Sequence, residues 1–184
     1  MKRNLSLLFF VMLMVTSSYS QEFLGIKVDG KFSTVIEKFK AKGFKLTGIT
    51  EKRIASMKGI AAGKQVELNI VCSPISKTVW KFSVYLPEHS TWSALKNEYS
   101  YYLDLLTEKY GEPNNKYDFF SDPYSEGDGY EETAVKTEKC TFSAFWDLYS
   151  VNISKWMQVN ITYENLVNSQ IDDAENKKLK KDVF

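Results

Sequence analysis

Apolar and polar residues alternate over two neighbouring stretches of the chain, residues 66–72 and 79–86. The apolar positions are Val66, Leu68, Ile70 and Cys72 in the first stretch and Trp80, Phe82, Val84 and Leu86 in the second. Side chains of a β-strand point alternately to its two faces, so each stretch predicts a strand with one buried and one open face. The turn residues Ser73 and Pro74 lie between them, and we expect an antiparallel hairpin.

A longer stretch after this hairpin has the spacing of a helix. Its apolar residues recur every three or four positions and are Trp92, Leu95, Tyr99, Tyr102, Leu106 and Tyr110. Ser90 or Thr91 stands at the N-cap position, and Gly111 and Pro113 follow the last apolar residue. These signals predict a helix whose apolar stripe is buried against an antiparallel sheet.

Shorter elements complete the pattern. Thr34 and Glu37 form a capping-box pair and Gly43 stands at a C-cap position, which predicts a helix over residues 34–42. Further strands are expected at residues 44–49, 53–58, 117–120 and 134–136, and at the alternating stretches 140–146 and 157–163. The charged residues 171–181 are expected to form a frayed helix. The sequence therefore predicts the α+β class.

The order of a helix followed by strands occurs twice in this prediction. The positions that correspond at nearly equal steps are Gly43 with Gly111, Val66 with Cys140 and Phe82 with Met157. We expect helix-plus-antiparallel-sheet units packed as one domain, with halves at residues 21–88 and 89–184. A tandem duplication and a chance similarity both remain open as the origin of this order.

The first twenty residues have the three-part composition of a secretory signal peptide. Lys2 and Arg3 precede an apolar run over residues 5–15, and the small residues Ser18 and Ser20 follow it. The run is shorter than the roughly 20 residues that span a bilayer. We therefore expect cleavage after Ser20 and no stable membrane insertion. No cysteine lies near the cleavage point, where a bacterial lipid anchor would need one, so no lipid anchor is expected. The expected product is a single domain over residues 21–184 in the periplasm or outside the cell.

Charge excludes one class of partner. The chain has 24 Lys and Arg against 23 Asp and Glu, and loss of Lys2 and Arg3 leaves it nearly neutral. Proteins that bind nucleic acid present a basic face, and the sequence shows none. No nucleic-acid partner is expected.

The residues that could carry catalysis or bind a metal form no motif. His89 is the sole histidine, and no nucleophile motif accompanies it. One histidine and two distant cysteines also lack the short spacings of a zinc site. We expect His89 to be a solvated turn residue, and the sequence predicts no catalytic, cofactor-binding or metal-ligating residue.

The two cysteines, Cys72 and Cys140, both fall on apolar strand faces. Export permits a disulfide between them. Two buried thiols that behave as small apolar side chains are the alternative.

An acidic segment follows the long helix. Its carboxylates are Asp118, Asp122, Asp128, Glu126, Glu131 and Glu132. Read as a calcium loop from Asp122, Gly127 is correctly placed, but Tyr124 and Thr133 stand where ligands are needed. A solvated acidic loop is therefore expected. The aromatic residues Phe119, Phe120, Tyr124 and Tyr130 form a contact surface for a glycan or a protein, or else fold back over the sheet.

Several segments resemble a family of uncharacterised exported proteins of gut bacteria. They are residues 23–30 (FLGIKVDG), 40–44 (KAKGF), 57–63 (MKGIAAG), 107–113 (TEKYGEP) and 161–164 (ITYE) with Asn168. The resemblance implies an exported α+β protein and no activity. The repeated helix-and-sheet order is also similar to the β-lactamase inhibitor protein-like fold, but no inhibitory loop of that fold can be placed here, so function does not follow from it.

Taken together, these features favour a non-enzymatic periplasmic or secreted module that binds an envelope protein or a glycan. An envelope hydrolase with a carboxylate pair is one alternative, and a purely structural accessory domain is another.

Overall fold

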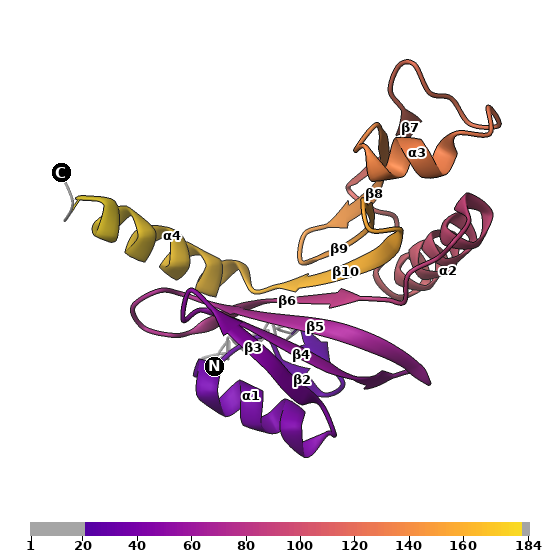
Figure 1. The fold of residues 1–184 in the computed structure, drawn as a ribbon. Helices are drawn as coiled ribbons and strands as arrows, with labels where there is room; N and C mark the ends of the chain where they lie inside the picture. The colour runs from indigo at the N-terminus through magenta and orange to yellow at the C-terminus, as the bar shows by residue number, and fades with distance from the viewer. Residues whose placement is uncertain (1–20, 182–184) are drawn as a thin grey trace, which may run out of the picture.

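The computed structural model describes residues 21–181 and is built around one eight-stranded antiparallel sheet (Figure 1). The predicted signal peptide lies outside the described residues. The α+β class is confirmed, since four helices accompany this sheet and a small two-stranded one within the described chain.

The first part of the chain forms one helix and four consecutive strands of the large sheet. These are α1 (Phe32–Ala41), β3 (Lys45–Thr50), β4 (Ile54–Ala61), β5 (Lys64–Cys72) and β6 (Val79–Tyr85). The second part repeats this order with a short helix inserted. It contains α2 (Trp92–Tyr110), β7 (Asn115–Phe120), α3 (Glu131–Lys136), β8 (Cys140–Trp146), β9 (Tyr149–Ser154) and β10 (Gln158–Glu164).

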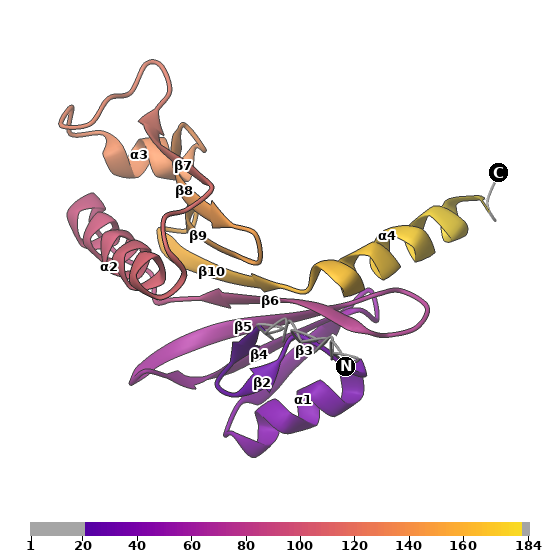
Figure 2. The same ribbon diagram turned by 180° about the vertical axis from the view of Figure 1, so that it is seen from behind.

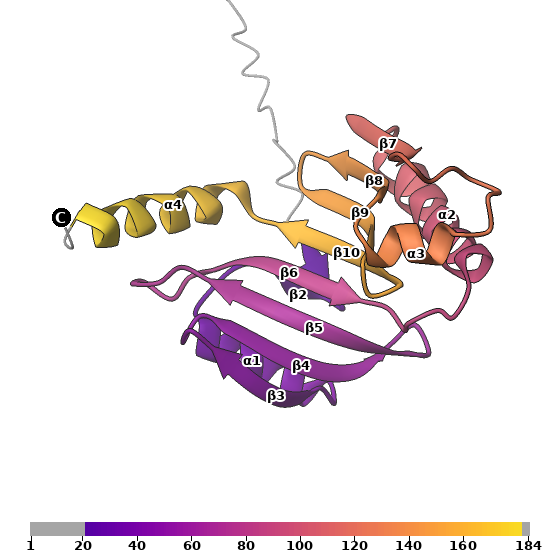
Figure 3. The ribbon, with the colours of Figure 1, turned by 45° about the horizontal axis from the view of Figure 1, so that its top comes forward.

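The two four-stranded units join edge to edge. The strand order is β3-β4-β5-β6-β10-β9-β8-β7, as Figure 3 shows, and β6 pairs with β10 at the centre. Val84 of β6 lies opposite Ile161 of β10 in an antiparallel register. The prediction that Val66 and Cys140 occupy equivalent positions in the two units is therefore wrong. Val66 lies in β5, the third strand of the first unit, whereas Cys140 begins β8, the second strand of the second unit. Gly43 and Gly111 both follow a helix, as expected.

Helices α1 and α2 pack on the same face of the sheet. The strand pairing shows that the two helices share a face. Phe82 in β6 lies opposite Tyr163 in β10, and the same row continues through Tyr149 to Trp146 in β8. Phe142 lies four residues before Trp146 in β8 and therefore points to the same face. The ring of Phe39 in α1 lies 5.2 Å from that of Phe82. The ring of Trp92 in α2 lies 5.0 Å from that of Phe142. One apolar core therefore extends under both helices.

The two strands with the clearest alternation are confirmed, with one correction. Val66, Leu68, Ile70 and Cys72 of β5 are buried on the helix face, as are Phe82 and Val84 of β6. Trp80 is not part of this row. A bulge pairs Cys72 with Val79 and Val71 with Lys81, which leaves Trp80 as the extra residue and gives its core position to Val79.

The predicted long helix is also confirmed. Its stripe residues Trp92, Leu95, Tyr99 and Leu106 are buried, while Tyr102 and Tyr110 are half-buried. The Thr91 hydroxyl accepts a hydrogen bond of 3.3 Å from the amide of Ala94, the N-cap contact.

Two local predictions are wrong. Helix α1 begins at Phe32 rather than Thr34 and its N-cap, Lys31, has no capping side-chain bond. The Phe32 amide instead donates to the Lys77 carbonyl oxygen at 2.9 Å, a distant contact that replaces the local cap. Residues 134–136 belong to α3 rather than to a strand, because Glu131 and Glu132 in its first turn and Lys136 in its last turn favour a helix.

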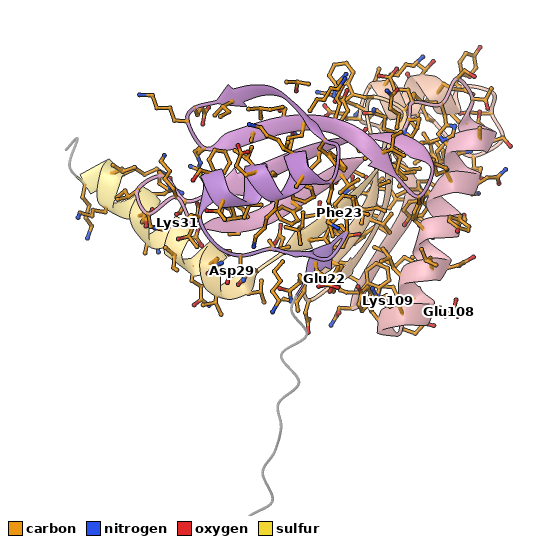
Figure 4. All side chains as sticks on the ribbon, turned by 90° about the horizontal axis from the view of Figure 1, so that it is seen from below. Glu22, Phe23, Asp29, Lys31, Glu108 and Lys109 are labelled. Carbon is orange, nitrogen blue, oxygen red and sulfur yellow. The ribbon has the colours of Figure 1, made fainter. Side chains whose placement is uncertain are left out.

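The hairpin of β1 (Glu22–Phe23) and β2 (Ile26–Lys27) connects the two units on the helix side. The Phe23 ring lies 6.2 Å from that of Phe39 and 5.7 Å from that of Tyr163. Figure 4 shows Glu22 and Phe23 between α1 and the end of α2 that carries Lys109. The hairpin thus contributes aromatic contact to both units.

Helix α4 (Leu166–Lys181) follows β10 and projects past the strands on the side away from α2 (Figures 1 and 2). Polar contacts anchor it, since its buried residues are Asn168 and Asp172. Asp172 forms an ion pair with Arg53 at 2.6 Å, and Asn168 donates to the Val79 carbonyl oxygen at 2.8 Å. The helix expected over 171–181 therefore starts earlier, and its contacts continue to Glu175, which accepts hydrogen bonds from the amides of Ile75 and Ser76.

Gly59 in β4 provides a direct test of core packing. A Cβ atom on Gly59 would lie 2.5 Å from the ring of Phe44, which is buried. Gly59→Ala should therefore lower the free energy of unfolding by about 1–3 kcal/mol, because the ring must shift. Chemical denaturation measures this loss. Gly48→Ala in β3 is the matched control, since its Cβ would meet open space, and equal losses at both glycines would contradict the predicted packing.

Candidate functional site

The face of the sheet opposite α1 and α2, here called the open face, carries short uncharged polar side chains at its centre. Residues directly opposite one another in neighbouring strands share a face. One such row is Asn69, Ser83, Thr162 and Ser150, and the next is Tyr85, Asn160, Asn152 and Ser143. The solvent side of a sheet more often carries long charged residues, as the outer pair Lys58 and Glu67 does here.

The centre of the open face is hollowed into a cleft of about 490 Å³. Its lining includes Lys81, Ser83, Tyr85, Phe145, Asp147, Ser150, Asn152, Asn160, Thr162 and Glu164. Ser83, Asn160 and Thr162 are each only 6% exposed, although the apolar core of the described residues lies on the helix side of the sheet. The volume falls within the range of small-molecule sites in proteins, and we call this feature the open-face cleft.

Hydrogen bonds hold the floor of the open-face cleft. The Thr162 hydroxyl donates to Asn160 Oδ1 at 3.0 Å, and Asn160 Nδ2 donates to the Val84 carbonyl oxygen at 3.4 Å. Asn152 Nδ2 also donates to Asn160 Oδ1 at 3.4 Å. These bonds fix the orientation of the Asn160 amide, so the floor presents a set arrangement of polar groups.

Charged and aromatic side chains lie at the margins of the open-face cleft. Lys81 and Glu164 form an ion pair at 2.8 Å, so their charges offset each other. Phe145 of β8 is 41% exposed and its ring lies 6.3 Å from that of Tyr117. Tyr85 of β6 lines the opposite side. The cleft therefore has a neutral polar floor between two aromatic side chains.

Two carboxylates in the described lining of the open-face cleft, Asp147 and Glu164, bear on the hydrolase alternative. Asp147 is exposed in the turn between β8 and β9, and Glu164 is bound to the Lys81 ammonium. A catalytic acid needs a carboxyl group kept protonated by an apolar environment. An exposed carboxylate and an ion-paired one both lack that environment.

The four aromatic residues predicted as a contact surface are not brought together. Phe119 and Tyr130 are exposed, at 48% and 63%. Phe120 points to the helix face, where its ring lies 5.3 Å from that of Trp92. Tyr124 is half-buried. Successive residues of β7 face opposite sides, so Phe119 and Phe120 cannot share one surface.

Three carboxylates of the acidic segment accept hydrogen bonds from backbone amides. Asp128 accepts bonds from the amides of Ser125 and Tyr130, and Glu131 accepts one from Gly127. Glu132 accepts a bond of 2.7 Å from the Trp92 amide at the start of α2, which lowers the pKa of Glu132. No three ligating side chains gather as a metal site in residues 21–181. The carboxylates order the loop and cap α2.

His89 is not the solvated turn residue that the sequence suggested. Its Nε2 lies 2.7 Å from Oε2 of Glu98, whose side chain is only 6% exposed. Glu98 also pairs with Lys64, at the start of β5. Glu98 follows Leu95 by three residues, so the helical spacing places Glu98 on the buried side of α2. A charged residue at a buried position of the helix is the feature of the sequence that could have predicted this cluster. The cluster ties α2 to the first unit and includes no nucleophile.

A disulfide between Cys72 and Cys140 is incompatible with the sheet. Both cysteines are free, and β6, β10 and β9 lie between their strands. Four strand intervals separate them by about 19 Å, whereas bridged cysteines have Cα atoms roughly 4–7 Å apart. Burial raises the pKa of Cys140 to about 12, so its thiol stays protonated.

Within residues 21–181, none of the helices has both the length and the apolar character needed to cross a membrane. Comparison with models of known protein families, with curated proteins and with solved structures gives no match. The resemblance to exported proteins of gut bacteria, and to the β-lactamase inhibitor protein-like fold, therefore stays a prediction.

Proposed function

We propose that this chain is an exported, non-enzymatic binding module whose ligand site is the open-face cleft. The observation that carries the proposal is the cleft itself, about 490 Å³ in volume and floored by hydrogen-bonded Asn160 and Thr162. A sheet face that only meets solvent has no need for a fixed hollow of small polar side chains. Such a hollow provides convergent polar groups, which fix the orientation of a bound ligand.

The chemistry of the cleft favours binding over catalysis. Neither Ser83 nor Ser150 forms a hydrogen bond to a histidine, and His89 is engaged with Glu98. Asp147 and Glu164 lack the surroundings that set a carboxylate pair apart as acid and base. Export is supported by the charged and apolar start of the sequence and by the small residues before Gln21.

The proposal is tested by nuclear magnetic resonance. The ¹⁵N-labelled protein is titrated with two defined mixtures, one of oligosaccharides and one of peptides, and amide shifts are followed. We expect saturable changes that cluster at Ser150, Asn152 and Thr162. Ser150→Tyr should abolish them by filling the hollow, while Ser56→Tyr, on the open face of β4 but outside the cleft, should not.

Two outcomes would overturn the proposed function. One is the absence of cleft shifts with both mixtures. The other is the release of cleaved oligosaccharide, detected by mass spectrometry, that stops in Glu164→Gln, since this would identify an enzyme.

A further inference from the structure

The lining of the open-face cleft indicates which ligands it suits. Each Ser and Thr hydroxyl and each Asn amide can both donate and accept hydrogen bonds. Ser83, Thr162, Ser150 and Asn152 place these groups on three adjacent strands, β6, β10 and β9. A sugar hydroxyl has the same dual capacity, so a ligand rich in hydroxyl groups can be satisfied at many points of this floor.

Charge narrows the ligand class further. Lys81 and Glu164 are bound to each other at 2.8 Å, the exposed carboxylate of Asp147 lies in the turn at the margin, and the floor between the two aromatic side chains has no charged residue. A phosphate or carboxylate on the ligand would lose its hydration there without gaining a cation. The cleft therefore disfavours an anionic ligand, and its uncharged floor matches a ligand without formal charge.

The two aromatic side chains fit the apolar faces of sugar rings. Tyr85 on β6 and Phe145 on β8 are separated by β10 and β9 and by two residues along the strand direction, about 16 Å at the backbone. Phe145 is 41% exposed, so its ring is available for contact. Aromatic rings bury the carbon-bound hydrogens of a ligand, while the polar floor binds its hydroxyl groups.

A protein partner fits this surface less well. Protein interfaces are enriched in aromatic residues, Met and Arg and depleted in Ser, and Ser and Thr seldom contribute strongly to them. The backbones of β10 and β9 are also paired on both sides, which leaves no edge for an added peptide strand in the cleft.

We propose that the open-face cleft binds a neutral glycan, with its hydroxyl groups on the Ser, Thr and Asn side chains of the floor and its ring faces on Phe145 and Tyr85. This inference rests on the proposed function, because it names the ligand class of the same site.

A glycan array containing neutral and acidic oligosaccharides, followed by calorimetry with the best binder, tests the inference. We expect selective binding to neutral glycans. Phe145→Ala should weaken it about tenfold, which corresponds to about 1.4 kcal/mol. Phe119→Ala is the matched control, because Phe119 is also exposed on the open face but lies outside the cleft, and binding should change less than twofold. Both variants alter exposed rings, and circular dichroism verifies that they fold.

The remaining outcomes distinguish a failure of the neutral-glycan inference from a failure of the proposed binding function. Binding to acidic glycans alone, or cleft shifts produced by peptides alone, would overturn the neutral-glycan inference and leave the proposed function standing. Neutral-glycan binding that Phe145→Ala and Ser150→Tyr leave unchanged would also overturn it, since the site would lie elsewhere. Failure of every probe to perturb the cleft would overturn both.

Discussion

Replacing Phe82 by Ala is expected to lower the free energy of unfolding by about 3–5 kcal/mol. Phe82 is 0% exposed and lies in β6, the strand at the boundary of the two units. Its ring contacts that of Phe39 in α1 at 5.2 Å, and its register partner is Tyr163 in β10. Truncation would leave a cavity bordered by elements that the sheet prevents from closing in. Urea denaturation followed by circular dichroism measures the loss.

Phe119→Ala serves as the control for this experiment. Phe119 is also a strand phenylalanine, but it is 48% exposed in the edge strand β7. Its replacement should change the free energy of unfolding by no more than about 0.5 kcal/mol. Similar losses for the two variants would show that Phe82 is not in the core.

The Phe82→Ala experiment also tests whether the two units fold together. The core runs from α1 to α2 without a break, and Phe23 contacts a residue of each unit. A single cooperative transition is therefore expected in both the original protein and the variant. Two separate transitions would contradict the prediction that residues 21–184 form one domain.

The elements that the sequence predicted well are those determined by local periodicity. Alternation at Leu68 and Ile70 predicted β5, and the stripe from Leu95 to Leu106 predicted α2. Both predictions succeed because burial of one face of an element determines the spacing of its apolar residues. Trp80 followed the same alternation and was nevertheless misplaced. The bulge that displaces it depends on how β6 pairs with β5, which the spacing within one strand does not contain.

The candidate site could not be predicted because it depends on long-range pairing. Ser83 and Thr162 appear in the sequence as ordinary polar positions of two strands. They become neighbours when β6 pairs with β10, a contact between the ends of the two units. The contacts of His89 could not be predicted for the same reason. Its partner Glu98 is close in the sequence, but Glu98 also pairs with Lys64, which comes from the first unit. From the sequence, the aromatic residues around Phe119 were instead predicted to form a contact surface, but the fold does not bring them together.

Leu106→Ala in α2 is expected to lower the free energy of unfolding by about 2–5 kcal/mol, because Leu106 is 6% exposed and belongs to the shared core. Lys96→Ala, in the same helix, should leave stability close to that of the original protein, since Lys96 is partly exposed and its pair with Glu126 is at the surface. Neither residue lies in the open-face cleft, so the Leu106 variant, assayed where it is still folded, should retain ligand affinity. Equal small losses at the two positions would show that α2 does not bury this stripe against the sheet. The assignment of the opposite face of the sheet as the open face would then also be wrong.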